Sequence, residues 1–178
     1  MQSLNQAVEK HLFAADDNLT FAVLDGASIP ELLEKIQALE PKCECLYMGE
    51  LEPDMAEVAP YLVQLEPGSD FFNWVVAAGW GKHWGIFAQT PSDFRTMRQH
   101  FRRSLVVYNS DGRPLMFRYY DPRVLCAHLQ KCKPEELKAL FGPVVTYVVE
   151  DEDSKVALRF SVESDALKTE RLVLEPKR

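Results

Sequence analysis

Hydrophobic residues recur along the chain in two alternating patterns, one typical of helices and one typical of strands. Spacings of three and four residues predict amphipathic helices over about 3–13, 30–40, 70–78 and 92–103. Short apolar runs closed by Gly or Pro predict strands over 19–24, 45–48, 61–65 and 84–88. Two more helices are expected to begin at Pro122, with Asp121 as the cap, and at Pro134, because proline fits the first turn of a helix.

The segment 105–119 gives the clearest local prediction. Apolar runs at 105–108 and 115–119 flank a polar stretch that contains Asp111-Gly112, a strong turn signal. This pattern predicts an antiparallel hairpin, with Arg118 inside its second strand.

Strands dominate after residue 144. We expect strands at 144–149 and 156–160, joined by an acidic turn, and an edge strand at 172–174. The expected fold is α/β, of the α+β kind: a single domain with a central mixed, largely antiparallel sheet flanked by helices, plus a strand-rich C-terminal tail. In this interpretation residues 1–144 form the main α/β unit, and 145–178 form a β hairpin or tail packed on the same domain.

Composition and charge narrow the function classes. The 178 residues carry a net charge of −7, which argues against general nucleic-acid binding and against anionic membrane surfaces. No apolar run approaches the roughly 20 residues that span a bilayer, and the N-terminus lacks the pattern of a secretory signal. A cytoplasmic protein is therefore expected, with reduced thiols at Cys43, Cys45, Cys126 and Cys132.

No group of residues has the spacing of a familiar catalytic or metal site. The chain contains no His-Glu-x-x-His, Cys-x-x-Cys or Gly-x-Ser-x-Gly sequence. The glycine-rich stretch 79–85 lacks the Gly-Lys-Ser/Thr ending of a phosphate loop. We therefore expect no catalytic residue, no metal and no cofactor, and we interpret Trp80 and Trp84 either as aromatic packing in a tight turn or as a contact surface.

Charged residues in the segment 117–123 need an explanation. A charge placed in an apolar strand requires a partner, so we expect a charge-assisted contact between Arg118 and Asp121. Either the segment forms an internal network that locks the strand-to-helix junction, or it recognises a partner's backbone or carboxylate. The residues concerned are Arg118, Tyr120, Asp121, Pro122 and Arg123.

A second basic feature lies on the helix predicted over 92–103. Arg95, Arg98 and Arg102 share one face at positions i, i+3 and i+7, and Arg103 adds to them. On an acidic protein this stripe is either a docking surface for an acidic partner or a solvated helix face.

Six segments, in order, resemble the adaptor (effector-chaperone) family of the bacterial type VI secretion system, formerly a domain of unknown function. The most informative is Phe-Arg-Tyr-Tyr-Asp-Pro-Arg-Val-Leu at 117–125. The others lie at 22–27, 59–63, 83–86, 100–103 and 141–144, with Phe101 where the family usually has Leu. Together they cover about residues 22–144, most of the chain.

The resemblance implies a cytosolic chaperone without an active site. Its partners would be a cognate secreted effector and the VgrG-type spike protein onto which the effector is loaded. Family members are often longer, with a helical lobe that contacts cargo, whereas this chain ends in a short strand-rich tail. Two alternatives remain: a small hydrolase- or nuclease-like enzyme using His100, Arg118 and Asp121, or an immunity protein that neutralises a toxin.

Overall fold

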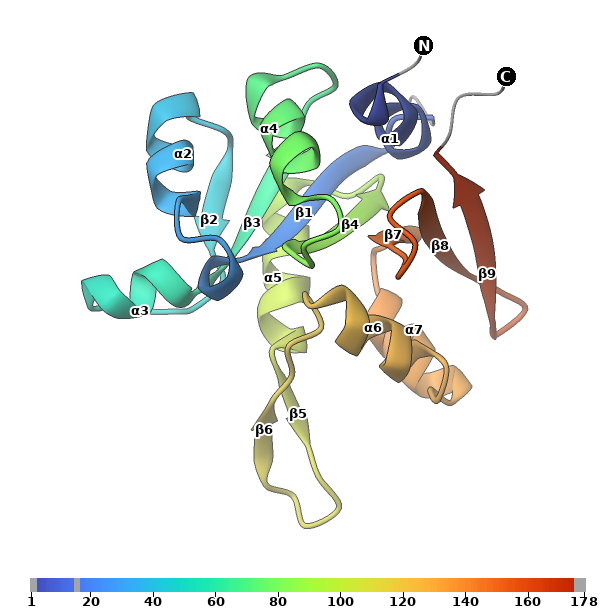
Figure 1. Ribbon diagram of the computed structural model, residues 1–178. Coiled ribbons are helices and arrows are strands. Elements are labelled where there is room, and N and C mark those ends of the chain that lie inside the picture. Colours follow the sequence, from blue (N-terminus) through green and yellow to red (C-terminus); the bar gives the residue numbers. More distant parts are fainter. Residues whose placement is uncertain (1–2, 15–16, 175–178) are drawn as a thin grey trace.

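The centre of the molecule is a seven-stranded sheet, seen in a computed structural model that describes residues 3–14 and 17–174 (Figure 1). The strand order is β2-β3-β1-β4-β7-β8-β9, and each neighbouring pair is antiparallel. The strands are β1 (Leu19–Asp25), β2 (Cys43–Cys45), β3 (Pro60–Leu65), β4 (Gly85–Thr90), β7 (Thr146–Glu150), β8 (Val156–Glu163) and β9 (Ala166–Val173). The predicted single α/β domain with a largely antiparallel sheet and a strand-rich C-terminus is confirmed.

Helices cover both faces of this sheet. Because side chains alternate along a strand, Ala22 and Leu24 of β1 face one hydrophobic core while Phe21 and Val23 face the other. The first core is covered by α1 (Leu4–Leu12), α2 (Leu32–Leu39) and α4 (Asp70–Gly79). The second is covered by α5 (Phe94–Ser104), α6 (Pro122–Leu129) and α7 (Pro134–Phe141).

Helix starts follow local capping chemistry. The Ser3 hydroxyl accepts from Gln6 N in a capping box, and Ser69 Oγ accepts from Phe72 N at 3.2 Å. The helix predicted from about residue 92 begins at Phe94, and its cap is Asp93, whose Oδ1 accepts from Thr96 N at 2.8 Å.

Three elements differ from the sequence prediction. Helix α3 (Pro53–Val58) was not expected, and since it buries no residue it has no amphipathic pattern to find. Strand β2 lies at 43–45 instead of 45–48, because the ladder to β3 ends when Cys45 pairs with Tyr61. Strand β9 is longer than its predicted edge strand at 172–174, because pairing with β8 extends it through charged residues such as Lys168 and Glu170.

The predicted hairpin is confirmed, and it forms a second, two-stranded sheet. Strands β5 (Val106–Tyr108) and β6 (Pro114–Met116) project away from the body of the molecule, at the bottom of Figure 1. The turn contains Gly112 at φ 73°, a conformation that favours glycine. Because β6 ends at Met116, Arg118 lies beyond the strand in which it was expected.

Within the described residues, 3–14 and 17–174, no helix is both long enough and apolar enough to cross a membrane.

Gly79, the last residue of α4, is expected to be intolerant of a side chain. A Cβ atom there would overlap the indole ring of Trp84, which is only 7% exposed. Gly79→Ala should therefore lower the free energy of unfolding by roughly 1–3 kcal/mol, the usual cost of overpacking. Without this overlap the same substitution would be expected to stabilise the helix, because alanine is a better helix former than glycine by about 1 kcal/mol. Urea unfolding measures this, and in a Trp84→Leu background the same substitution should cost less. Equal costs in both backgrounds would show that the ring is not the obstacle.

Candidate functional site

The carboxylate of Asp25 joins the beginning of the domain to the segment 117–123. Asp25 ends β1, and its side chain is only 3% exposed. Its Oδ2 accepts from Arg118 Nη2 at 2.6 Å and from Ser28 Oγ at 2.7 Å, while Oδ1 accepts from Ala27 N at 3.2 Å. The predicted contact between Arg118 and Asp121 is therefore wrong in its partner, since the guanidinium pairs with Asp25, 93 positions earlier.

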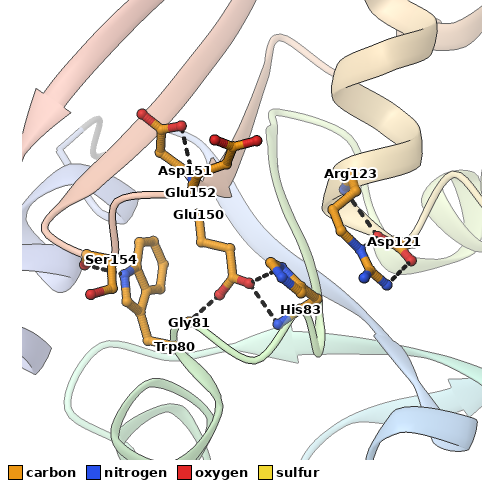
Figure 2. A network of polar contacts seen from close by, with 9 residues as sticks. All are labelled: Trp80, Gly81, His83, Asp121, Arg123, Glu150, Asp151, Glu152 and Ser154. Carbon is orange, nitrogen blue, oxygen red and sulfur yellow. Dashed lines mark hydrogen bonds and ion pairs between the residues drawn. The ribbon is translucent and has the colours of Figure 1, made fainter.

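Asp121 instead binds Arg123, two residues further on. Its Oδ1 accepts from the backbone N–H and from Nε of Arg123, both at 3.0 Å, and its Oδ2 accepts from Nη2 at 2.7 Å (Figure 2). Burial alone would raise the pKa of Asp121, but these hydrogen bonds from Arg123 outweigh it and hold the pKa below its ordinary value. Asp121 thus caps α6 as predicted, with Pro122 at the first turn.

The tyrosines of this segment are packed inside the protein. Tyr119 stacks on Phe101 with ring centroids 5.6 Å apart, and its hydroxyl donates to Phe101 O at 2.9 Å. Tyr120 is buried below the Arg118 guanidinium, whose Cζ lies 5.8 Å from the ring centroid. Burial, followed by the influence of Tyr47, raises the pKa of Tyr120. These contacts make Arg118 and Tyr120 parts of an internal network, while the side chain of Arg123 is largely exposed.

A third buried carboxylate, Glu150, holds the glycine-rich loop at 79–85 (Figure 2). Glu150 ends β7, and its oxygens accept from Gly81 N at 2.5 Å and from His83 N at 2.6 Å. The same side chain lies 2.5 Å from His83 Nδ1. Trp80 Nε1 donates to Ser154 O at 2.8 Å, so the loop is tied to the turn between β7 and β8 at two points.

The tryptophans differ in their exposure. Trp84 is buried and packs against Trp74, with ring centroids 5.1 Å apart. Of the two interpretations, aromatic packing therefore describes Trp84, because its ring fills the core and is removed from the surface. Trp80 is partly buried and stacks on Phe87 at 6.1 Å.

A hollow of about 310 Å³ lies between this turn and α6. Arg123 and Cys126 line one side, and Glu150, Asp151 and Glu152 line the other. Burial, with Asp151 and Asp121 nearby, raises the pKa of Cys126 to about 11, so this side chain is a neutral thiol at physiological pH. All four cysteines are free thiols.

The arginine stripe on α5 is largely engaged with β2. Arg98 Nη1 donates to both oxygens of Glu44, at 2.6 Å and 2.5 Å. Arg102 Nη2 donates to Glu44 Oε1 at 3.3 Å and to Cys45 O at 2.9 Å. These contacts tie a helix to a strand and so give Arg98 and Arg102 a structural role, while a docking role for the stripe stays a prediction. Arg95 and Arg103 are exposed.

The residues of the enzyme alternative each have a different partner. His100 Nε2 lies 3.0 Å from Leu140 O, while Arg118 binds Asp25 and Asp121 binds Arg123. Across the described ranges, 3–14 and 17–174, no group of three or more His, Cys, Asp or Glu side chains is placed to hold a metal ion.

Apolar side chains are concentrated on the β5–β6 hairpin, where the body of the protein does not cover them. Tyr108 is 71% exposed and Met116 is 56% exposed, and Val106, Val107 and Leu115 are exposed as well. The sequence predicted the hairpin but not its exposure. Both strands are apolar at consecutive positions, a pattern typical of strands that are buried on both faces, so the local sequence carried no signal for this exposure.

The family described as a domain of unknown function, DUF4123, matches residues 20–139, and the chain belongs to this family. The matched segment contains Asp25, Arg118, α5, the hairpin and α6, and it ends before β7. No curated protein and no solved structure has significant similarity to the chain.

Removing Arg118 should destabilise the protein more than removing Arg123. Arg118→Ala leaves the buried Asp25 carboxylate with two hydrogen bonds and no cation, and we expect a loss of roughly 1–3 kcal/mol, because half of the Arg118 side chain is in water. Arg123→Ala removes an exposed partner within the same helix turn, for which about 0–1 kcal/mol is expected. Chemical denaturation measures both losses. Equal losses would show that the Asp25–Arg118 pair contributes no more stability than the Asp121–Arg123 pair.

Acid should weaken the contact between α5 and the end of α7. Burial lowers the pKa of His100, the bond to Leu140 O opposes this, and Arg103 lowers the pKa further, so the net shift is downward. Below pH about 6.5 the unfolded chain binds a proton that folded His100 does not. The free energy of unfolding should therefore decrease as the pH is lowered below that value. His100→Gln keeps a donor for Leu140 O and should lose less stability between pH 8 and pH 5. The same pH slope in both proteins would contradict this.

Proposed function

We propose that the protein is an adaptor that binds a type VI secretion effector and helps to load it onto a VgrG-type spike protein, without itself catalysing a reaction. The observation that carries this proposal is the exposed apolar hairpin. Contiguous apolar surface on a protein marks an interaction site, and a projecting two-stranded ribbon is only marginally stable in water. A protein partner that covers the ribbon accounts for both features.

Family membership supports the proposal. The matched residues 20–139 contain the whole hairpin and five of the six segments that resemble the secretion adaptors. The remaining segment, 141–144, follows directly after the matched region.

A second exposed apolar patch suits a protein that binds two partners. Met48, Met55 and Val58 are exposed on and before α3, in a stretch that also contains four acidic residues between 50 and 57. Helix α3 and the hairpin are well separated in Figure 1. One patch is thus available for cargo and the other for the spike. An adaptor of this kind acts before export, so the proposed location is the cytoplasm.

Affinity purification of the tagged full chain from its native bacterium tests this function. Mass spectrometry of the captured proteins should identify an effector and a VgrG-type protein. A variant with Val107→Ser and Leu115→Ser should capture at least about tenfold less effector, because interface anchors typically contribute more than 1 kcal/mol each. The matched control, Val145→Ser with Val173→Ser, also removes two exposed valine-sized groups but lies outside the hairpin, and it should capture normal amounts.

Three outcomes would overturn the proposal. Capture of neither protein would exclude an adaptor of this secretion system. A toxin captured without a spike protein would favour an immunity protein. Unchanged effector capture by the hairpin variant would remove the observation on which the proposal rests.

A further inference from the structure

The hairpin has apolar side chains on both of its faces. In its register Val106 pairs with Met116, Val107 with Leu115, and Tyr108 with Pro114. Because side chains alternate along each strand, the first and third pairs share one face and the middle pair lies on the other. A flat partner surface would cover only one of these faces, so the ribbon is suited to a partner that contacts both.

Backbone bonds, rather than side-chain packing, maintain the shape of the ribbon. Phe117 N donates to Leu105 O at 2.8 Å at its base, and Asn109 N donates to Arg113 O at 3.0 Å near its tip. The Asn109 side chain completes the turn by accepting from Asp111 N at 3.0 Å and Arg113 N at 2.9 Å. These bonds define the conformation in which a partner meets the ribbon, and a partner that covers it adds the packing that an isolated two-stranded ribbon lacks.

A groove continues the apolar surface from the base of the ribbon onto α6. It is a shallow, open depression of about 580 Å³, lined by Phe117, Val124, Ala127, His128 and Lys131 together with the Asp121–Arg123 pair. Phe117 follows β6 directly, and its ring lies 4.6 Å from that of His128. The same residue thus belongs to the ribbon base and to the groove, which joins the two into one surface.

The charge around this surface is opposite to the charge of the rest of the chain. Residues 94–133, which include α5, the hairpin and α6, contain nine Lys and Arg but only two Asp, a net charge of +7. The remaining residues therefore carry −14. Part of the positive charge is neutralised by Glu44 and Asp25, but Arg103, Arg113 and Lys131 are exposed. A cationic surface of this kind attracts acidic partners and rejects basic ones.

We infer that the ribbon and the groove together form one docking surface for an apolar segment of the cargo that also carries Asp and Glu residues. Apolar side chains of that segment contact both faces of the ribbon and enter the groove beside Phe117. Its carboxylates lie near Arg113 and Lys131. The inference depends on the proposed function only in naming the partner as cargo, since the chemistry of the surface is the same for any partner.

Photo-cross-linking in the native bacterium tests both the surface and the chemistry of its partner. Benzoylphenylalanine replaces Tyr108 on the ribbon, Val124 in the groove, or Val173 on β9 as the control position. The first two positions should cross-link to one and the same segment of one protein, and peptide mass spectrometry should show that this segment is apolar and net acidic. The control should not reach it.

Several results would overturn the inference. These are cross-links from Tyr108 and Val124 to different proteins, a basic segment, a second copy of this chain, or no cross-linked protein at all. If the segment is apolar and acidic but belongs to a protein that is not an effector, the docking surface stands and the proposed function fails.

A kinetic measurement tests the role of charge separately. A synthetic peptide of the cross-linked segment should associate roughly tenfold more slowly at low salt with the Arg113→Glu, Lys131→Glu variant than with the unmodified protein. The control variant Lys10→Glu, Lys138→Glu has the same net charge but changes exposed residues on α1 and α7. Equal slowing by both variants would show that overall charge, rather than this surface, controls binding.

Discussion

The buried carboxylate of Asp25 is the constraint on which the arrangement of the domain depends. It ends β1, an interior strand of the sheet, where water cannot solvate it, so a cation and hydrogen-bond donors must be brought to it. Arg118 supplies the cation from a distant part of the sequence. Once Arg118 is held there, the course of the chain on either side is fixed: the hairpin must leave the body just before it, and α6 must begin just after it.

Two further carboxylates act in the same way at other places. Glu44 of β2 holds Arg98 and Arg102 of α5, and Glu150 of β7 holds the backbone of the loop at 81–83. Each of these links joins elements that are far apart in the sequence. The Glu44 site is partly open to solvent, whereas Glu150 is buried, and both carboxylates set how a helix or a loop lies against the sheet. In the part of the chain that the structure describes, no ion pair of this kind ties the hairpin strands to the body of the protein.

The sequence allowed the elements to be predicted wherever one local rule dominated. The apolar run before Asp25-Gly26, the turn at Asp111-Gly112 and the cap at Asp121 all depend on nearby residues, and the structure contains each of them. The ion pairs could not be assigned in this way. Asp121 is the nearest acid to Arg118 in the sequence, but the topology of the sheet places Asp25 closer in space. Pairing of residues separated by dozens of positions is a property of the fold.

Surface exposure was equally hard to predict from local patterns. Trp84 was a candidate for a contact surface because tryptophan is enriched at interfaces, whereas Gly79 leaves room for its ring in the core. Arg98 and Arg102 were assigned to an open stripe because helical spacing says which residues share a face but not what lies opposite that face. Conversely, the apolar residues of the hairpin were read as ordinary strand residues, although the body of the protein leaves them in water.

The ladder between β4 and β7 has a consequence for how far a domain of this family extends. The matched region ends at residue 139, but β4 lies inside it and is paired along Phe87, Ala88 and Gln89 with β7, which lies outside it. On the other side, α1 precedes the matched region, yet Leu12 O accepts from Thr20 Oγ1 at 2.8 Å and from Gln89 Nε2 at 2.6 Å. The region that matches the family is thus shorter than the part of the chain that packs into one domain. In this chain, removal of the residues after 139 would leave this edge of β4 unpaired, so the matched region alone would expose backbone groups that the whole domain keeps paired.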